Sequence, residues 1–445
     1  MQAAQAECLY PLERLWQSPC VVGENRLARK PSHPWAFRAG MRAGAFSWHG
    51  TAKAVERLKV ASSEIRALSR SDPVAAAEGV IVLAERIWPA FEHIDTSSGA
   101  LGTAVRRTLG DLVPVLIAAP AHEGVRAQWL ERIRTAIAED GVDYLAPLAD
   151  RFGEISVYPA LINDHADRDL AMVSAAWADH ARFIHIPTAT LTLSCLLEAG
   201  RYDELLTLME AKKSRLWFDE KFAAEALIRQ GREDEALARA AALMEDDRQS
   251  WGRQEIARFC EALLIRRGQP DEAYRRFGLP TATGNTWLAM WRDLVKRYPD
   301  TDPRGILEDL IALHGRKGKW FAAAKTAGYL DIALDCAQDS EAAPATLTRA
   351  ARDFAVKEPA FATSVALCAI RHLIAGRGYD AGPHDIDEAT EHLIAASRQV
   401  GSMDLVQEEL KRIVAGGRNA DPLAMRLRER ILLLEGKANG EAGLP

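Results

Sequence analysis

The sequence predicts an all-α protein: a right-handed α-solenoid of helical hairpins, preceded by an N-terminal helical region. Three observations lead to this prediction. Apolar residues recur at helical spacing from Gly50 almost to the C-terminus. No segment shows the sustained alternation that is typical of a strand. A short register also returns wherever one apolar helical run ends and the next begins.

The register places a glycine three residues before an aspartate. Its five copies are Gly200/Asp203, Gly231/Asp234, Gly268/Asp271, Gly328/Asp331 and Gly401/Asp404. Glycine suits the left-handed residue that closes a helix, and aspartate suits the N-cap of the following one. The first two intervals between glycines, 31 and 37 residues, are typical of hairpins of the tetratricopeptide-like type.

The chain divides into four parts on this basis. Residues 1–47 form an extension rich in Pro, Gly and Arg, residues 48–164 a helical region, residues 165–436 the repeats, and residues 437–445 a flexible tail. The extension is disordered, or docks as an arm through Trp16 or Trp35, or precedes a true start at Met41. We expect residues 1–40 to contribute little to the fold.

Apolar stripes define the helices in order. The first stripe spans residues 54–68, and Asp72-Pro73 then begins a helix that runs to Pro89, because proline is favoured at the first helical position. Further helices are expected at 101–117, 123–139 and 142–151. The helix from 359 to 376 is apolar nearly all round except at Arg371 and His372, so it belongs inside the array, whereas 402–415 is half charged and belongs at a surface.

Composition excludes some classes of protein. The net charge of −6 argues against general nucleic-acid binding, although a local basic patch remains compatible with it. The six cysteines form no Cys-x-x-Cys pair, which indicates a reducing, cytoplasmic compartment. No apolar run reaches the roughly 18 residues that a membrane span requires.

Two acidic and histidine-rich segments are candidate metal sites. The first joins residues 163–169 to Asp179, His180 and His185, and the second spans His384 to His392. Helix caps explain these acids better, because the histidine spacings do not match a metal-binding helix. The small-residue run 97–103 lacks the Gly-Lys-Ser/Thr of a phosphate-binding loop. No cofactor, metal or catalytic residue is therefore assigned.

One basic patch stands out as a candidate binding site for an acidic peptide, a phosphate-bearing ligand or single-stranded nucleic acid. Its cations lie close in sequence to a tryptophan, and ligands of these kinds bind to positive charge and to aromatic rings. The competing interpretation is a solvated turn with the tryptophan in the core. The candidate residues are Arg316, Lys317, Lys319, Trp320, Lys325, Arg349 and Arg352.

Residues 259–414 resemble a group of uncharacterised bacterial helical-repeat, tetratricopeptide-like proteins. The resemblance is carried by Asp271-Glu-Ala-Tyr-Arg-Arg-Phe-Gly, Gly318-Lys-Trp-Phe-Ala-Ala-Ala-Lys and Thr346-Leu-Thr-Arg-Ala-Ala-Arg-Asp-Phe. Some relatives of this kind occur near SWIM-type zinc fingers. This chain lacks the Cys-x-Cys and Cys-x-His ligands of that motif, so the resemblance implies a fold and no zinc site.

These observations favour a non-catalytic scaffold that binds a protein or peptide on a concave helical surface. The alternatives are a regulator that binds an anionic ligand or nucleic acid through the basic patch, and an enzyme without a recognisable motif.

Overall fold

A computed structural model describes residues 33–178, 186–245, 252–416 and 421–441, with side chains as far as residue 435. These residues form helices joined by turns, and no strand occurs among them. The all-α prediction is thus confirmed for the described part of the chain. No helix within these ranges is long and apolar enough to cross a membrane.

The chain forms two compact units. The first contains residues up to 215 together with 225–230, and the second contains 216–224 and the residues from 231 onward. The division therefore falls well beyond the boundary expected near residue 165.

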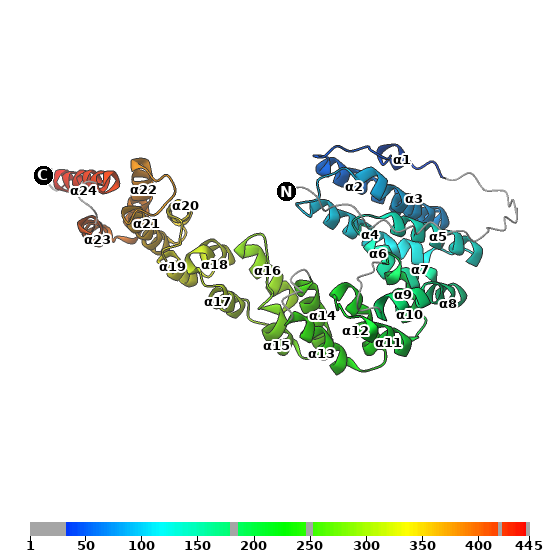
Figure 1. Cartoon of the computed structure of the whole chain (residues 1–445). Helices are drawn as coiled ribbons and strands as arrows, with labels where there is room; N and C mark the ends of the chain where they lie inside the picture. Colours follow the sequence, from blue (N-terminus) through cyan, green and yellow to red (C-terminus); the bar gives the residue numbers. More distant parts are fainter. Residues whose placement is uncertain (1–32, 179–185, 246–251, 417–420, 442–445) are drawn as a thin grey trace, which may run out of the picture. The chain divides into compact units, whose positions relative to one another are not determined.

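The first unit is built from helices that the periodicity largely anticipated. Its helices are α1 (Phe37–Gly40), α2 (Thr51–Ser69), α3 (Pro73–Phe91), α4 (Ala100–Ala118), α5 (Glu123–Glu139), α6 (Ala146–Asp150), α7 (Phe152–Ser156), α8 (Pro159–Arg168), α9 (Leu170–Ala178), α10 (Ala189–Glu198) and α11 (Tyr202–Ala211). Helices α2, α3 and α4 pack on one another, and α10 packs on α6, α7 and α8 (Figure 1).

The N-terminal unit begins earlier than expected. Trp35, Phe37 and Met41 are buried, although the extension was drawn as far as residue 47. The indole of Trp35 lies so close to Gly79 on α3 that a Cβ at position 79 would come within 2.3 Å of it. The Glu64 carboxylate accepts the Ala36 and Phe37 backbone N–H groups at 2.8 and 3.1 Å. Residues 33–41 are therefore part of this unit, whereas Trp16 lies outside the described residues.

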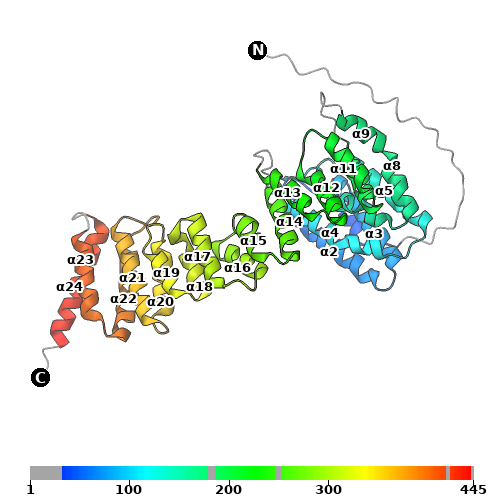
Figure 2. The same cartoon turned by 90° about the horizontal axis from the view of Figure 1, so that it is seen from below.

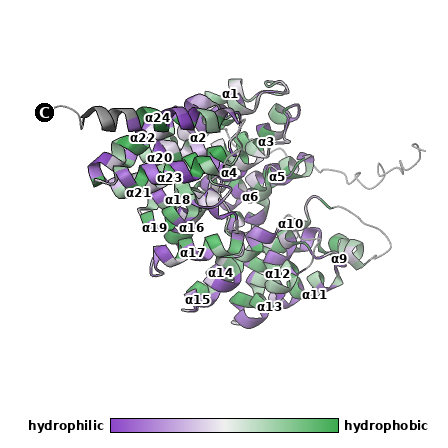
Figure 3. Cartoon of the chain, turned by 90° about the vertical axis from the view of Figure 1, so that its left-hand side faces the viewer, coloured by the Kyte–Doolittle hydropathy of each residue, from purple (hydrophilic) through white to green (hydrophobic). Residues whose placement is uncertain are grey.

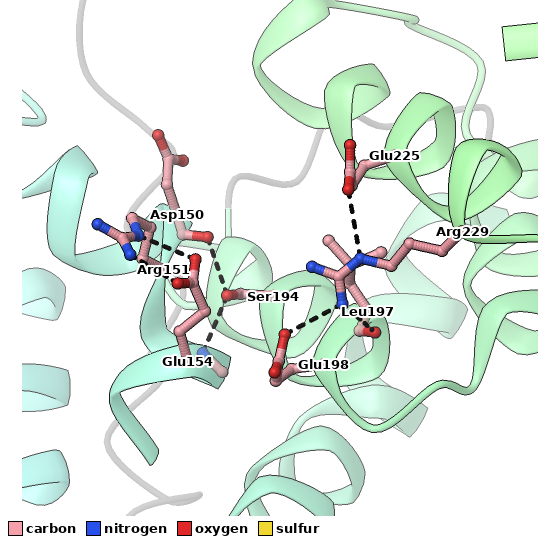
Figure 4. A network of polar contacts seen from close by, with 9 residues as sticks. Asp150, Arg151, Glu154, Ser194, Leu197, Glu198, Glu225 and Arg229 are labelled. Atoms are coloured by element: carbon pink, nitrogen blue, oxygen red, sulfur yellow. Dashed lines mark hydrogen bonds and ion pairs between the residues drawn. The ribbon is translucent and has the colours of Figure 1, made fainter. Parts of the chain in front are cut away.

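A single serine illustrates how tightly the helices of this unit approach. The Ser194 hydroxyl on α10 donates to the Asp150 carbonyl oxygen at 2.9 Å and accepts the Gly153 N–H at 3.0 Å (Figure 4). A Cβ at Gly153 would lie 2.4 Å from the Ser194 carbonyl oxygen, so only glycine permits this contact. Beside it, Arg229 binds Glu198 at 3.1 Å and Glu225 at 3.3 Å. These polar groups satisfy one another and hold the helices together.

The second unit continues as a series of packed helices. Its elements are α13 (Glu233–Met244), α14 (Arg253–Arg266), α15 (Pro270–Ala273), the π-helix η3 (Tyr274–Gly278), α16 (Trp287–Arg297), α17 (Pro303–His314), the 3-10 helix η4 (Lys317–Trp320), α18 (Phe321–Ala327), α19 (Leu330–Ala337), α20 (Pro344–Phe354), α21 (Pro359–Ile374), α22 (Pro383–Val400), α23 (Met403–Ala415) and α24 (Pro422–Glu441). Helix α12 (Trp217–Arg229) contributes residues to both units. Figure 2 shows α17 to α24 following one another in chain order.

The helices of the second unit are amphipathic. Helix α20 packs on α21 and α22, and α24 packs on α22 and α23. Apolar and polar residues alternate around the helices, so both colours appear along most of them in Figure 3. The apolar stripe of α21 is almost fully buried, as expected from its composition. Each helix thus buries its stripe against its neighbours in sequence.

The predicted helix ends are confirmed at all five register glycines. Gly200, for example, has a φ of +71° and follows the end of α10 at Glu198. The N–H of the next residue, Arg201, then donates to the Leu196 carbonyl oxygen at 3.0 Å, which is the bond that closes a Schellman motif. Gly376 closes α21 in the same way, although no aspartate follows it at the register position.

The predicted aspartate caps are wrong. Asp203, Asp234 and Asp271 are the second residues of α11, α13 and α15, and none of these helices has a side-chain cap. The reason is that only three residues separate the helices in these cases, as Ala199, Gly200 and Arg201 do between α10 and α11, so the next helix begins one residue before the aspartate. The carboxylates still lie in the first turn, where the helix dipole favours them.

This difference leads to a test with a matched control. Asp302 caps α17 by accepting the Arg304 and Gly305 N–H groups, each at 3.1 Å. We expect Asp302→Ala to lower the free energy of unfolding by about 1 kcal/mol, and Asp271→Ala by less than about 0.5 kcal/mol. Urea unfolding measures both, and hydrogen exchange of the first-turn amides localises them. Equal losses for both variants would restore the cap interpretation.

Candidate functional site

The basic patch predicted from the sequence begins at η4 and is largely compensated there. Arg316 has a left-handed backbone, with a φ of +48°, and binds Glu341 at 3.1 Å. Lys317 binds Asp335 at 2.5 Å, which raises the pKa of the lysine. A Cβ at Gly318 would lie 2.2 Å from the Ala342 nitrogen, so the turn packs directly on the acidic connection between α19 and α20.

Trp320 is a core residue and not a contact residue for a partner. Its side chain is fully buried, at 0% exposure. Its ring lies 4.8 Å from that of Trp287 and 6.1 Å from that of His314, measured between centroids. Burial of Trp320 contradicts its predicted role in binding. It agrees with the competing interpretation, a solvated turn with the tryptophan in the core.

The remaining cations of the patch fall into two groups. Arg352 binds Asp353 at 2.9 Å. Lys325 lies 5.9 Å from the centre of the Phe354 ring, and Arg349 donates to the Thr346 hydroxyl at 3.2 Å. Within the described ranges, Lys319, Lys325 and Arg349 form no ion pair with a carboxylate. The patch therefore retains some uncompensated charge, at fewer positions than predicted.

The acidic and histidine-rich segments serve the fold where they are described. Asp169 is buried and accepts the Thr188 hydroxyl at 2.7 Å and Arg134 at 2.5 Å. Asp387 binds Arg426 at 2.9 Å, which holds the pKa of the carboxyl below its usual value. No group of three or more metal-ligating side chains occurs among the described residues. Asp179, His180 and His185 lie outside them.

The described cysteines are buried free thiols. Burial raises the pKa of Cys195 and of Cys260 to about 12, and that of Cys336 to about 11. A thiol with such a pKa stays protonated at neutral pH and is a poor nucleophile. These residues act as small apolar side chains of the core.

The surface that combines shape and charge is a shallow open groove between α21 and α23. Its lining combines apolar and charged side chains. It is lined by Arg371, Ile374 and Ala375 of α21, by Glu409, Arg412 and Ile413 of α23, and by Gly416. We call it the α21–α23 groove.

The charged residues that line the groove carry an excess of positive charge. Glu409 accepts Arg371 at 2.6 Å and Arg412 at 2.8 Å. The hydrogen bond from Arg371 is the main reason that the pKa of Glu409 lies below its usual value, and the charges of Arg371 and Arg412 add to it. The carboxyl is therefore ionised at neutral pH. Two guanidinium groups share one carboxylate, and the Arg412 side chain remains 75% exposed. The Arg412 guanidinium therefore has N–H groups left that could bind the carboxylate of a partner.

The position of α21 is fixed from its buried side. His372 follows Arg371, and its Nε2 lies 2.9 Å from the Ala337 carbonyl oxygen, while its Nδ1 lies 2.9 Å from the Arg377 guanidinium. Because a carbonyl only accepts and a guanidinium only donates, Nε2 carries the proton and the ring is neutral. Burial lowers the pKa of His372, in agreement. Helix α21 is thus anchored to the end of α19, and Arg371 faces outward.

The sequence pattern indicates parts of this groove but not the groove itself. Arg371 and His372 were noticed as polar exceptions in an apolar helix, and 402–415 was assigned to a surface. The signal in the sequence that pointed to this groove was a polar residue on an otherwise apolar helix. The pairing of Arg371 with Glu409, 38 residues away, has no counterpart in the sequence pattern.

No family model, curated protein or solved structure matches this chain.

Proposed function

We propose that this protein is a non-catalytic scaffold that binds a protein partner through the α21–α23 groove. The partner segment would present an apolar side chain beside an acidic one. The apolar side chain would lie on Ile374 and Ile413, and its carboxylate neighbour would bind Arg412. The observation that carries this proposal is the combination of apolar side chains with an excess of cations in the lining of the groove.

The architecture supports a scaffold. We propose that the packed hairpins form a right-handed, tetratricopeptide-like α-solenoid, whose successive helices would expose one continuous surface. The glycine-closed connections of two or three residues support this arrangement, because they return the chain after each helix. The reducing cytoplasm stays the expected compartment, and the buried free thiols are compatible with it.

A peptide array tests the proposal directly. The probes are peptides of about 12 residues that carry one Leu, Ile or Phe flanked by Asp or Glu, with matched peptides in which Lys replaces the acids. We expect binding of the acidic set only. The affinity of the best probe is then measured by fluorescence anisotropy, and Arg412→Glu should weaken it at least tenfold, which corresponds to about 1.4 kcal/mol.

The matched control is a charge reversal elsewhere on the same unit. Arg352→Glu changes a half-exposed arginine that also pairs with a neighbouring acid but lies outside the groove. It should leave the affinity unchanged. If neither peptide set binds, or if both reversals weaken binding equally, the groove is not the partner site.

The second candidate function uses the basic patch, because Lys319 and Arg349 lack carboxylate partners within the described residues. A regulator of this kind would bind a single-stranded oligonucleotide or a polyphosphate with an affinity that falls steeply with salt. The double change Arg349→Glu and Arg352→Glu would abolish that binding, whereas Arg412→Glu would spare it. The same set of variants thus separates the two functions.

A further inference from the structure

Three residues supply the charges that line the α21–α23 groove. Glu409 of α23 accepts hydrogen bonds from Arg371 of α21 at 2.6 Å and from Arg412 of its own helix at 2.8 Å. The other residues of the lining are uncharged. Two guanidinium groups and one carboxylate leave the lining with a single excess positive charge.

The three charged side chains differ in how much of their surface reaches solvent. Glu409 is 22% exposed, Arg371 is 47% exposed and Arg412 is 75% exposed. Arg412 can therefore donate to the carboxylate of a partner while it keeps its bond to Glu409. Arg371 is held by Glu409 across the two helices, so a second carboxylate would reach it only by displacing Glu409 or by lying beside it. Two like charges at such short range repel each other.

We propose that Glu409 limits the groove to partners that carry one acidic group beside the apolar side chain. This inference rests on the function proposed above and adds the number of charges that the partner presents. The carboxylate of Glu409 neutralises one of the two positive charges, so one acidic group of the partner neutralises the other. A second acidic group would enter a neutral site next to Glu409 and would add no affinity.

Replacing Glu409 with glutamine tests this limit, because it raises the excess positive charge from one to two and nearly preserves the size of the side chain. Three peptides of equal length serve as probes, each with one leucine followed by Asp-Asn, Asp-Asp or Asn-Asn. The unaltered protein should bind the Asp-Asn and Asp-Asp peptides with affinities that agree within about twofold, and the Asn-Asn peptide less tightly. Glu409→Gln should bind the Asp-Asp peptide at least about fivefold more tightly than the Asp-Asn peptide. Fluorescence anisotropy at one fixed ionic strength measures all of these affinities.

Glu408 provides the matched control, since it precedes Glu409 in the chain and lies outside the lining of the groove. It binds Lys411 at 3.1 Å, and this lysine also binds Glu435 at 3.0 Å. Glu408→Gln changes the net charge of the protein by the same amount, so it reproduces any long-range effect on an acidic peptide. Its ratio of affinities for the Asp-Asp and Asp-Asn peptides should equal the ratio of the unaltered protein.

The opposite change removes the excess charge from the groove. Arg371→Gln leaves Glu409 paired with Arg412 alone, so the lining becomes neutral. The Asp-Asn peptide should then bind no more tightly than the Asn-Asn peptide. Circular dichroism verifies that each variant is folded, and Arg371→Gln tests the same charge count in the event that Glu409→Gln does not fold.

The outcomes separate this inference from the proposed function. If the unaltered protein prefers acidic peptides but Glu409→Gln shows the same ratio of affinities, the charge limit is overturned and the groove remains the partner site. A clear preference of the unaltered protein for the Asp-Asp peptide, or an equal rise of the ratio in both glutamine variants, overturns the limit as well. If the unaltered protein binds none of the acidic peptides more tightly than the Asn-Asn peptide, the groove itself is contradicted, and the charge limit with it.

Discussion

Replacing Arg126 with methionine is expected to lower the free energy of unfolding by about 3–5 kcal/mol. Arg126 is 1% exposed, and its guanidinium donates to the carbonyl oxygens of Leu116 at 2.5 Å, Ala119 at 2.7 Å and Ile155 at 3.2 Å. Two of these carbonyls belong to the end of α4, which has no glycine to close it. Methionine fills much of the space but removes the guanidinium donor from all three carbonyls, of which Ala119 still accepts the Ala121 N–H at 2.8 Å.

Two further variants separate charge from geometry. Arg126→Lys keeps the positive charge, but its single ammonium group cannot reach all three carbonyls, so we expect an intermediate loss. Arg107→Met removes an exposed arginine from α4 itself and should change stability by less than about 0.5 kcal/mol. Chemical unfolding monitored by circular dichroism distinguishes the three. A loss below about 1 kcal/mol for Arg126→Met would mean that water replaces the guanidinium.

The second large effect is expected at Trp35. Trp35→Ala removes a buried indole that lies against Gly79, and the change should lower the free energy of unfolding by about 3–5 kcal/mol. A chain that starts at Met41 should lose at least as much, since it also lacks Phe37 and the two N–H groups held by Glu64. This expectation replaces the earlier one that residues 1–40 contribute little.

Trp48 is the matched control, because it is the same residue type and is 61% exposed. Trp48→Ala should leave the melting temperature nearly unchanged, whereas Trp35→Ala should lower it by several degrees. If the Met41 chain melted like the full chain, the packing of Trp35 would be incidental to the stability of this unit.

The register glycines were predictable because their role is local. A left-handed residue at the end of a helix needs glycine whatever lies around it, so Gly200 and its counterparts could be placed from the sequence alone. The aspartates three residues later were misassigned by two helical positions, because they are the second residues of their helices and not the N-caps. Cap and first-turn positions both favour acids, and the pattern does not show how many residues the connection contains.

The candidate site was less predictable, since it depends on which distant residues meet. The sequence suggests that Lys317 is free to bind a ligand, but Asp335 on α19 neutralises its charge. Trp320 had two interpretations, and only its packing against Trp287 decides between them. The groove needs the exposed side of an apolar helix, α21, to lie beside a helix that the sequence placed at a surface, α23. Periodicity identifies faces but not their neighbours.

The short connections at the register glycines, of two or three residues, also bear on how the chain reaches this structure. Contacts between helices of the second unit join residues close in sequence: Arg258 meets Asp293 after 35 residues, Tyr274 meets Asp309 after 35, and Arg426 meets Asp387 after 39. Loops of this length close at a small entropic penalty. During synthesis, each hairpin can therefore complete its packing soon after the following helix leaves the ribosome, without waiting for the far end of the chain.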